Sequence, residues 1–331
     1  MGRVAILKPD HLGDLVLSVP AIRAICSRHP DPALFVAPGS LGLAKYLFPE
    51  IDDIRPVSFQ HLSRKTVEGV SPEECAQDLR GFDFLFCLRD DDVMREIARQ
   101  SAIDHAIASG GHLTHETAIQ KRAVTAVIGD YSRTRLFSDL PIFWPEQPRH
   151  VGLCIAAGFP TNRWPNAYWF DLAQQLARRG IFLTLLGGPG ERDDLNLLSQ
   201  LLGNAPHRVL QGGSDFRAFF DELAPVDLVV ASDGGTAHLC SLYKPICSIF
   251  GSSPWRRYAP FGRDNVLITR DEVCSPCVQF STNEINGCMT RECTALLQPE
   301  QVGRVLFTNG LDFPKIPGTR VERGVSHHYD S

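Results

Sequence analysis

The feature that most constrains the fold is a pair of apolar runs joined by a glycine turn and a short small-residue segment. The first run, Asp227–Ala231, stops at Ser232, and the sequence Asp-Gly-Gly-Thr follows at once at positions 233–236. The second run, Ile246–Phe250, ends in Gly-Ser-Ser. This order predicts a strand, a tight turn, a helix and a second strand, which is typical of an α/β sheet.

The turn between these runs predicts an anion site. A helix N-terminus carries unpaired backbone N–H groups and the positive end of the helix dipole. Gly234 and Gly235 let the backbone approach a ligand closely because neither residue has a Cβ. Asp233 stands at the strand end, where a carboxylate can accept from ligand hydroxyls or from backbone amides.

Length and composition favour two globular domains. The chain has 331 residues, of which 44% are hydrophobic and 21% charged, and its net charge of −5 argues against a dedicated nucleic-acid binder. No apolar run reaches the roughly 18–20 residues of a membrane helix, and Lys8 and Asp10 interrupt the first run, which is therefore no signal peptide. We expect a cytoplasmic protein without a transmembrane segment.

A polar loop follows the first predicted strand, Val4–Leu7. Ligands of open α/β sheets bind outside the carboxyl ends of the strands, where this loop must lie. A helix is predicted over Leu15–Ser27, with Pro20 inside it as a source of a kink. The candidate site residues of the loop are Lys8, Asp10, His11, Gly13 and Asp14.

A proline-rich segment, Pro141–Pro148, separates two halves that show the same alternation of strands and helices. We predict a first domain over 1–147 and a second over 148–310, with a cysteine-rich insertion at 271–295. The last residues, 311–331, lack periodicity, which predicts a mobile tail.

Four of the ten cysteines are spaced as metal ligands: Cys274, Cys277, Cys288 and Cys293. A two-residue spacing lets both thiolates of a pair reach one metal, and a short loop can return the second pair. Four sulfur ligands suit structural zinc, or iron in a rubredoxin-like site, and unligated thiols are the alternative. The remaining histidines, including His112 and His115, are predicted to be surface residues.

Four segments, in this order, resemble the heptosyltransferases of lipopolysaccharide assembly, glycosyltransferase family nine. They are KPDHLGDLVLSVPAIRAI (8–25), NRWPNAYWFDLAQQL (162–176), LLGGPGE (185–191) and SDGGTAHLCSLYKPICSIFGSS (232–253). The resemblance implies the GT-B fold, in which two Rossmann-like, doubly wound parallel-sheet domains face a central cleft. It also implies inverting, metal-independent transfer of a sugar, most simply heptose from ADP-heptose, to a hydroxyl of a glycan, lipid, protein or small molecule. Peripheral membrane contact is compatible with such an acceptor.

By this resemblance Asp14 is the general base that takes the proton of the acceptor hydroxyl. An ionised aspartate at a loop tip suits that role without a raised pKa. The alternative is that Asp14 only caps the following helix, and His11 is a rival base. Lys8 faces a donor or acceptor phosphate, or else is a solvated charge at the strand end.

The resemblance assigns the donor to the second domain. The turn after the strand would hold the diphosphate, with His238 on a phosphate oxygen. Glu191 would accept both ribose hydroxyls, or else would only stabilise the next helix through its first turn. The predicted donor residues are Asp233, Gly234, Gly235, Thr236, His238, Glu191, Arg163 and Ser214.

One position departs from the family pattern. The family places a lysine two residues before the Trp-Pro pair, where this chain has Asn162 followed by Arg163. Either Arg163 replaces the missing cation or the donor phosphate is held differently, with Arg256 and Arg257 as further candidates. The nucleotide and the sugar therefore stay open.

Other functions give different expectations. A GT-B sugar-nucleotide epimerase or hydrolase would act on the donor alone, whereas a transferase needs an acceptor. A dinucleotide oxidoreductase is disfavoured because no G-x-G-x-x-G follows the first strand. A non-catalytic scaffold built around the cysteines would keep its partner binding after Asp14→Ala.

Overall fold

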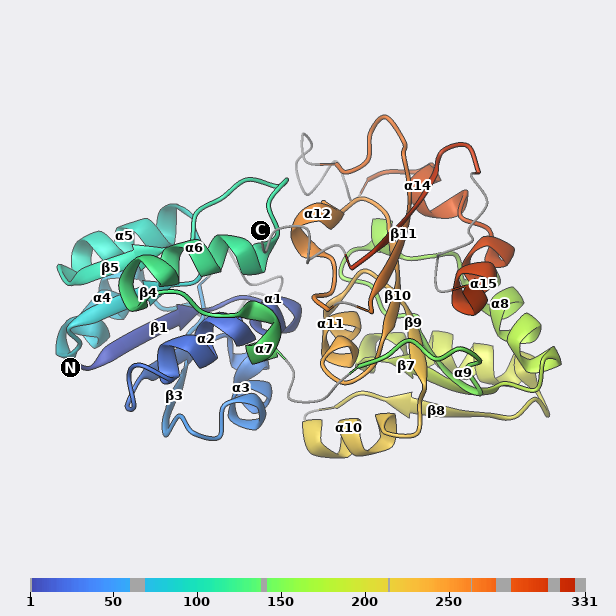
Figure 1. Cartoon of the computed structure of the whole chain (residues 1–331), viewed down its shortest axis with the longest axis horizontal. Helices are drawn as coiled ribbons and strands as arrows, with labels where there is room; N and C mark the ends of the chain where they lie inside the picture. Colours follow the sequence, from blue (N-terminus) through green and yellow to red (C-terminus); the bar gives the residue numbers. More distant parts are fainter. Residues whose placement is uncertain are drawn as a thin grey trace. The chain divides into compact units, whose positions relative to one another are not determined.

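In the computed structural model the chain forms two compact units, Met1–Asp139 and Leu140–Ser331 (Figure 1). The structure describes residues 2–59, 69–137, 142–213, 215–262, 264–277, 287–308 and 316–324. The predicted boundary at 147/148 lies further along the chain, at the end of the proline-rich segment. No helix in these ranges has both the length and the apolar character needed to cross a membrane.

The first unit contains a parallel sheet of five strands in the order β3-β2-β1-β4-β5. The central strand β1 is buried along its whole length, because both faces of a parallel sheet are covered by helices. The strands are β1 Val4–Lys8, β2 Ala33–Val36, β3 Asp53–Pro56, β4 Phe84–Cys87 and β5 Asp104–Ile107. The helices are α1 Leu12–Leu17, α2 Val19–Cys26, α3 Leu41–Leu47, α4 Pro72–Asp78, α5 Asp92–Ser101, α6 Glu116–Ile128 and α7 Arg133–Phe137, with 3₁₀ turns η1 Pro38–Ser40 and η2 Leu79–Gly81.

The helix predicted over Leu15–Ser27 is two helices. α1 begins earlier than predicted, at Leu12, and the chain breaks at Ser18 before α2. Pro20 lies in the first turn of α2, where the missing N–H has no intrahelical partner to lose. The proline therefore starts the second helix and does not kink the middle of one.

The second unit contains a sheet of seven strands in the order β12-β11-β10-β9-β6-β7-β8. Every neighbouring pair is parallel except β11 and β12. The strands are β6 His150–Cys154, β7 Phe182–Gly187, β8 His207–Gln211, β9 Leu228–Ser232, β10 Ile246–Phe250, β11 Val266–Arg270 and β12 Thr319–Arg323. The helices are α8 Asn166–Arg178, α9 Arg192–Leu202, α10 Phe216–Leu223, α11 Gly235–Ser241, α12 Trp255–Tyr258, α14 Glu292–Ala295 and α15 Pro299–Thr308, with 3₁₀ turns η3 Pro160–Asn162 and η4 Pro189–Glu191.

The strand β12 lies inside the segment predicted to be a mobile tail, so that prediction is wrong for Thr319–Arg323. Val321 pairs with Ile268 in the antiparallel ladder on β11. An edge strand is held mainly by main-chain hydrogen bonds, so its sequence need not show a regular spacing of apolar residues. Arg320 also forms an ion pair with Asp271, with Nη2 2.9 Å from Oδ2. The other parts of the predicted tail, 311–315 and 325–331, lie outside the described residues.

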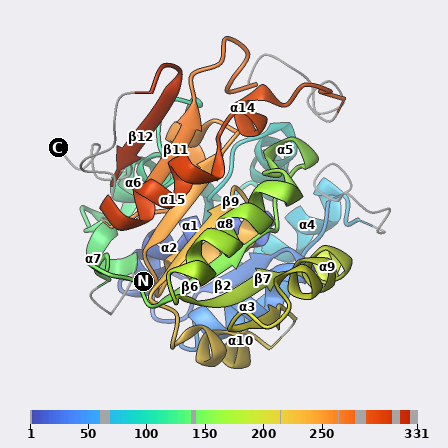
Figure 2. The ribbon, with the colours of Figure 1, turned by 90° about the vertical axis from the view of Figure 1, so that its right-hand side faces the viewer.

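Two tryptophans fill the core beneath α8. Trp164 and Trp169 are each 1% exposed, and their rings meet edge to face with centroids 4.9 Å apart. The indole Nε1–H of Trp164 donates to the carbonyl of Leu297, 2.8 Å away, just before α15. Figure 2 shows α8 and α15 side by side over the sheet, and this hydrogen bond ties the start of one to the start of the other.

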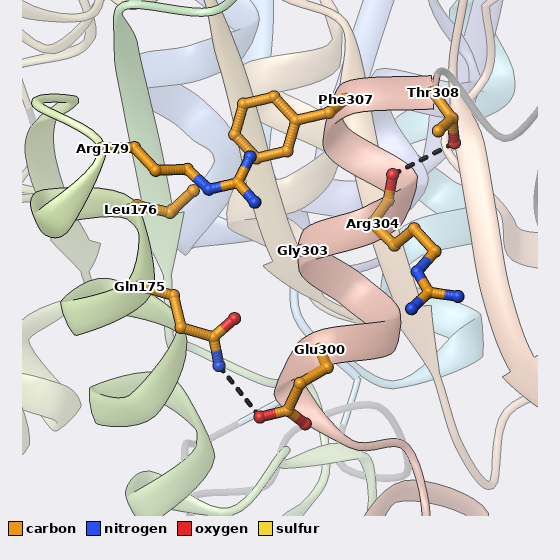
Figure 3. Close-up of a pocket in the computed structure, with 8 residues that line it drawn as sticks. All are labelled: Gln175, Leu176, Arg179, Glu300, Gly303, Arg304, Phe307 and Thr308. Carbon is orange, nitrogen blue, oxygen red and sulfur yellow. Dashed lines mark hydrogen bonds between the residues drawn. The ribbon is translucent and has the colours of Figure 1, made fainter.

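A cavity of about 300 Å³ lies between α8 and α15 (Figure 3). Arg179 lies over the Phe307 ring at 4.3 Å, and Gln175 donates to Glu300 at 3.1 Å. The remaining lining residues are Leu176, Gly303, Arg304 and Thr308. None of the residues predicted for the donor site is among those that line this cavity.

Replacing each tryptophan by phenylalanine tests what the indole hydrogen bond contributes. Trp164→Phe leaves the buried Leu297 carbonyl without its donor, whereas the Nε1–H of Trp169 has no partner within the described residues. We expect Trp164→Phe to lower the free energy of unfolding by about 1–2 kcal/mol more than Trp169→Phe. Urea unfolding followed by circular dichroism checks this, and equal losses would contradict it.

Candidate active site

Polar residues gather at the carboxyl ends of the strands in each unit. In the first unit they come from the end of β1, from α1, from the residue after β4 and from the start of α6. In the second unit they follow β6, β7, β9 and β10.

Lys8 ends β1 with its side chain only 2% exposed. Its Nζ donates to the Leu88 carbonyl at 2.9 Å and lies 3.0 Å from Asp10 Oδ2 and 3.9 Å from Glu116 Oε1. Burial lowers the pKa of Lys8, but the carboxylates of Asp10, Glu116 and Asp14 outweigh it, and the pKa is raised. Lys8 is therefore a buried internal counter-ion and not a solvated charge, while its predicted contact with a phosphate stays a prediction.

Asp10 is 4% exposed and shares its carboxylate between Lys8 and Arg89. Burial raises the pKa of Asp10, and the two cations outweigh it, so the pKa is lowered. Arg89 also pairs with Asp91, which caps α5 by accepting from the Met94 N–H at 2.9 Å. Asp10, predicted to face the acceptor, is thus committed to a buried ion network.

Asp14 lies within α1 and is partly exposed, while Gly13 beside it is buried. The N-cap residue of α1 is His11, so the alternative in which Asp14 caps this helix is wrong. The helix starts earlier than predicted because His11 already has the extended conformation of an N-cap. His11 itself is exposed.

The pKa of Asp14 is raised to about 7, contrary to the expectation of an ordinary value. Burial of the carboxyl group is the main cause, and the negative charge of Asp10 comes next. Glu116 adds to the effect, while Lys8 and Arg89 oppose it. The residue lies beside an ion network and not at a solvated loop tip, which explains the difference.

The start of α6 completes the first group, and the sequence did not reveal it. His115, predicted as a surface residue, is fully buried and caps α6 through Thr117, whose N–H donates to Nδ1 at 3.3 Å. Glu116 and Gln120, both buried, face Lys8 and Ser18. An acidic residue at the start of a helix gives no sequence sign that it is buried.

In the second unit the predicted strand, turn, helix and strand are confirmed as β9, the turn 233–234, α11 and β10. A Cβ on Gly234 would lie 3.0 Å from the Gly158 nitrogen and 3.2 Å from Ala157 Cα, so only glycine fits without displacing backbone. The Gly158 N–H donates to the Asp233 carbonyl at 2.8 Å. The loop after β6 therefore packs directly on the turn.

Asn162 is fully buried and joins three strand ends. Its Nδ2 donates to Asp233 Oδ2 at 2.7 Å and to Ser253 Oγ at 2.6 Å. Its Oδ1 accepts from the backbone N–H and the hydroxyl of Ser252, at 2.9 and 2.7 Å. The carboxamide is saturated internally, and burial raises the pKa of Asp233 to about 6, against the opposing Ser253 hydroxyl.

Arg163 points to two acidic side chains. Its Nη2 lies 3.1 Å from Glu191 Oε1 and its Nη1 3.6 Å from Asp194 Oδ2, with the side chain 41% exposed. Glu191 Oε2 accepts from the Gly188 N–H at 3.0 Å, and Glu191 is the N-cap residue of α9. Both oxygens of Glu191 thus have protein partners, and its side chain makes no capping hydrogen bond to α9.

The remaining predicted donor residues occupy varied environments. His238 is 5% exposed within α11, whereas Gly235 and Thr236 are partly exposed. Arg256 and Arg257 on α12 lie over the rings of Trp255 and Tyr258, at 4.3 and 5.1 Å. Ser214 lies outside the described residues.

The four clustered cysteines do not form a metal centre in the described part of the chain, where no group of three or more His, Cys, Asp or Glu side chains could hold an ion. Cys274 is exposed, Cys277 and Cys288 are half-buried, and Cys293 is buried in α14, where burial raises its pKa to about 12. The predicted zinc or iron at Cys274, Cys277, Cys288 and Cys293 is therefore not supported, and residues 278–286 between the pairs lie outside the described ranges.

Comparisons with known proteins agree on one family. The model of glycosyltransferase family 9 (heptosyltransferase) matches residues 106–286. Lipopolysaccharide heptosyltransferase 1 of Pseudomonas aeruginosa is 32% identical over 152 residues, which are 44% of this chain and 38% of that protein. The match thus spans less than half the length of that relative.

Solved structures show the same fold. A glycosyl transferase family 9 structure from Veillonella parvula superimposes with a TM-score of 0.73 at 17% identity, covering 93% of this chain and 97% of the other. The E. coli heptosyltransferase WaaC with ADP-2-deoxy-2-fluoro heptose gives 0.65 at 17% identity, covering 93% and 99%. At such identities the likeness establishes the two-domain GT-B architecture.

Asp14→Asn should make the protein more stable at alkaline pH. Because the folded-state pKa of about 7 exceeds the ordinary 3.8, ionisation of Asp14 costs stability progressively as pH rises from about 4 to 7. We expect Asp14→Asn to gain about 1–3 kcal/mol over the parent at pH 8, with the gap closing toward pH 4. Unfolding at several pH values measures this. Asp92→Asn, at a fully exposed site, should show no such trend, and a gap that stays constant with pH would refute the assignment.

The Asn162 network should be costly to break. Asn162→Ala removes the hydrogen-bond partner of the buried Asp233 carboxylate and of the Ser252 N–H. We expect it to lower the free energy of unfolding by about 2–4 kcal/mol. Asn166→Ala is a matched control because Asn166 donates to Asp194 at 2.8 Å on the surface, where about 0.5 kcal/mol is expected. Comparable losses for the two variants in urea unfolding would show that the network does not stabilise the unit.

Proposed function

The chain belongs to glycosyltransferase family 9, and we propose that it transfers heptose from ADP-heptose to an acceptor hydroxyl, with inversion and without a catalytic metal ion. The names of its relatives support heptose as the sugar, and the similar E. coli structure solved with ADP-2-deoxy-2-fluoro heptose supports the donor. The observation that carries the proposal is Asp14, a partly exposed residue on α1, the helix after β1, whose carboxyl pKa is raised to about 7.

A general base works best when its pKa lies near the working pH, because it is then largely ionised and still basic enough to accept a proton. In the proposed step the Asp14 carboxylate takes the proton of the acceptor hydroxyl. The hydroxyl oxygen attacks the anomeric carbon from the face opposite the diphosphate, and the bond from that carbon to the phosphate oxygen breaks. The electron pair of that bond leaves with ADP.

The second unit is proposed to hold the donor. The backbone N–H groups of Gly235 and Thr236 point out of the first turn of α11, and fixed dipoles of this kind stabilise a departing diphosphate without a metal. Asn162 holds the turn through Asp233. It is not proposed to contact the phosphate, because its amide N–H groups and its carbonyl oxygen already have partners in the protein. Arg163, whose side chain is 41% exposed, is proposed to contact the diphosphate, and Glu191 is proposed to exchange its contact with Arg163 for the ribose hydroxyls.

Asp14→Asn should abolish turnover and leave donor binding intact. General-base catalysis contributes about 10²–10⁴-fold, so we expect a loss of that size in kcat. ADP release would be measured with ADP-heptose and heptose-free lipopolysaccharide, and donor binding by thermal shift with ADP-heptose alone.

The same assay separates the alternatives. Conversion of ADP-heptose without any acceptor, at the rate seen with one, would indicate an epimerase or hydrolase. Turnover by Asp14→Asn within twofold of the parent would exclude Asp14 as the base. Asp92→Asn is the matched control, because it removes an exposed carboxylate from the same unit.

A further inference from the structure

We propose that Glu116 and Gln120, one turn apart on α6, are positioning residues for Asp14. Gln120 fixes the turn of chain that carries Asp14, and Glu116 places a second buried negative charge beside it. The inference rests on the proposed function only in taking Asp14 as the base. The resemblance of the loop after β1 to the family implies a role for Asp14, but it assigns none to α6.

Hydrogen bonds connect the side chain of Gln120, through Ser18, to the backbone of Asp14. Gln120 is fully buried, and its Nε2 donates to Ser18 Oγ at 3.0 Å and to Glu116 Oε1 at 3.2 Å. The Ser18 hydroxyl donates in turn to the carbonyl of Asp14 at 2.8 Å. Ser18 is the break between α1 and α2, so the carboxamide of Gln120 fixes the end of the helix that presents the base.

Glu116 is 3% exposed and acts through charge. It begins α6, where the helix dipole favours an anion, and it lies 3.9 Å from Lys8 Nζ. Lys8 also lies 3.0 Å from Asp10, and Arg89 is bound by Asp10 and Asp91. Lys8 and Arg89 are thus engaged by carboxylates other than that of Asp14.

The carboxylate of Asp14 differs from those of Asp10, Asp91 and Glu116 in its ion pairing. Within the described ranges it forms no ion pair, although Asp10 and Glu116 both act on it as like charges. Of the other groups near this end of α6, Arg133 donates to Thr117 at 2.8 Å, His115 caps the helix, and His11 is exposed at the start of α1. Asp10 and Glu116 thus share Lys8, and their negative charges favour the protonated form of Asp14.

Two substitutions should move the pH profile in opposite directions. Glu116→Gln keeps the shape and the hydrogen bond from Gln120 but removes a negative charge, so Asp14 should ionise at lower pH. Arg89→Gln removes a positive charge from a side chain that is 32% exposed, so Asp14 should ionise at higher pH. A pKa shift of about half a unit to one unit should raise turnover at pH 6, relative to pH 8.5, about 3- to 5-fold in Glu116→Gln and lower it about 3- to 7-fold in Arg89→Gln.

The experiment measures kcat/KM from pH 5 to 9 with ADP-heptose and heptose-free lipopolysaccharide. Carbon-13 NMR of labelled aspartate follows the Asp14 carboxyl directly, identified as the resonance missing from Asp14→Asn. Asp92→Asn should leave both readouts unchanged. Gln120→Leu should lower kcat about 10-fold with an unchanged KM for ADP-heptose, because it loosens the turn and removes no charge.

The outcomes are distinct. If the Asp14 resonance titrates at the same pH in folded Glu116→Gln, Arg89→Gln and the parent, the charge role is overturned. An unchanged kcat in Gln120→Leu overturns the positioning role. If the resonance moves as expected and the rate profile does not follow, the inference about Glu116 stands and Asp14 is not the base.

Discussion

The buried ammonium of Lys8 determines how the first unit is built at its functional end. A charge that is 2% exposed must be paired and hydrogen-bonded, because desolvation of an isolated ion costs several kcal/mol. Asp10 from the loop after β1, the Leu88 carbonyl just after β4 and Glu116 from α6 meet that need. The pairing holds three segments of the chain around one atom, while the carboxylate of Asp14 makes no ion pair with a residue of the described ranges.

In the second unit a neutral side chain, and not a cation, holds the buried carboxylate of Asp233. Asn162 holds the Asp233 carboxylate and the two serines after β10, so a neutral carboxamide joins the ends of β6, β9 and β10. A neutral group offsets the desolvation of Asp233 less well than an ammonium does, and the pKa of Asp233 accordingly rises to about 6. In both units a buried polar centre holds the loops that carry the candidate ligand contacts.

The sequence revealed what depends on local pattern. Apolar runs and glycines identified β9, α11 and β10, and the motifs at strand ends identified the family. It did not reveal pairings between distant residues. Lys8 and Glu116 are far apart in sequence, so neither the burial of Lys8 nor the raised pKa of Asp14 follows from the loop alone. Cysteine spacing likewise does not fix whether four thiols can converge, and the edge strand β12 has no apolar periodicity.

Where the family pattern has a lysine this chain has Asn162, so Arg163 is the neighbouring residue that could neutralise the charge of the donor's diphosphate. Asn162 would have to give up four buried hydrogen bonds to reach a ligand, at about 1 kcal/mol or more for each. Arg163 is 41% exposed and Glu191 12%, and ion pairs near a protein surface are worth only about 0–1 kcal/mol. A diphosphate, with more charge than a carboxylate and a geometry that suits a guanidinium fork, can compete for that side chain at little cost. The same exchange would free an oxygen of Glu191, so binding of the phosphate and recognition of the ribose would be coupled through one weak ion pair.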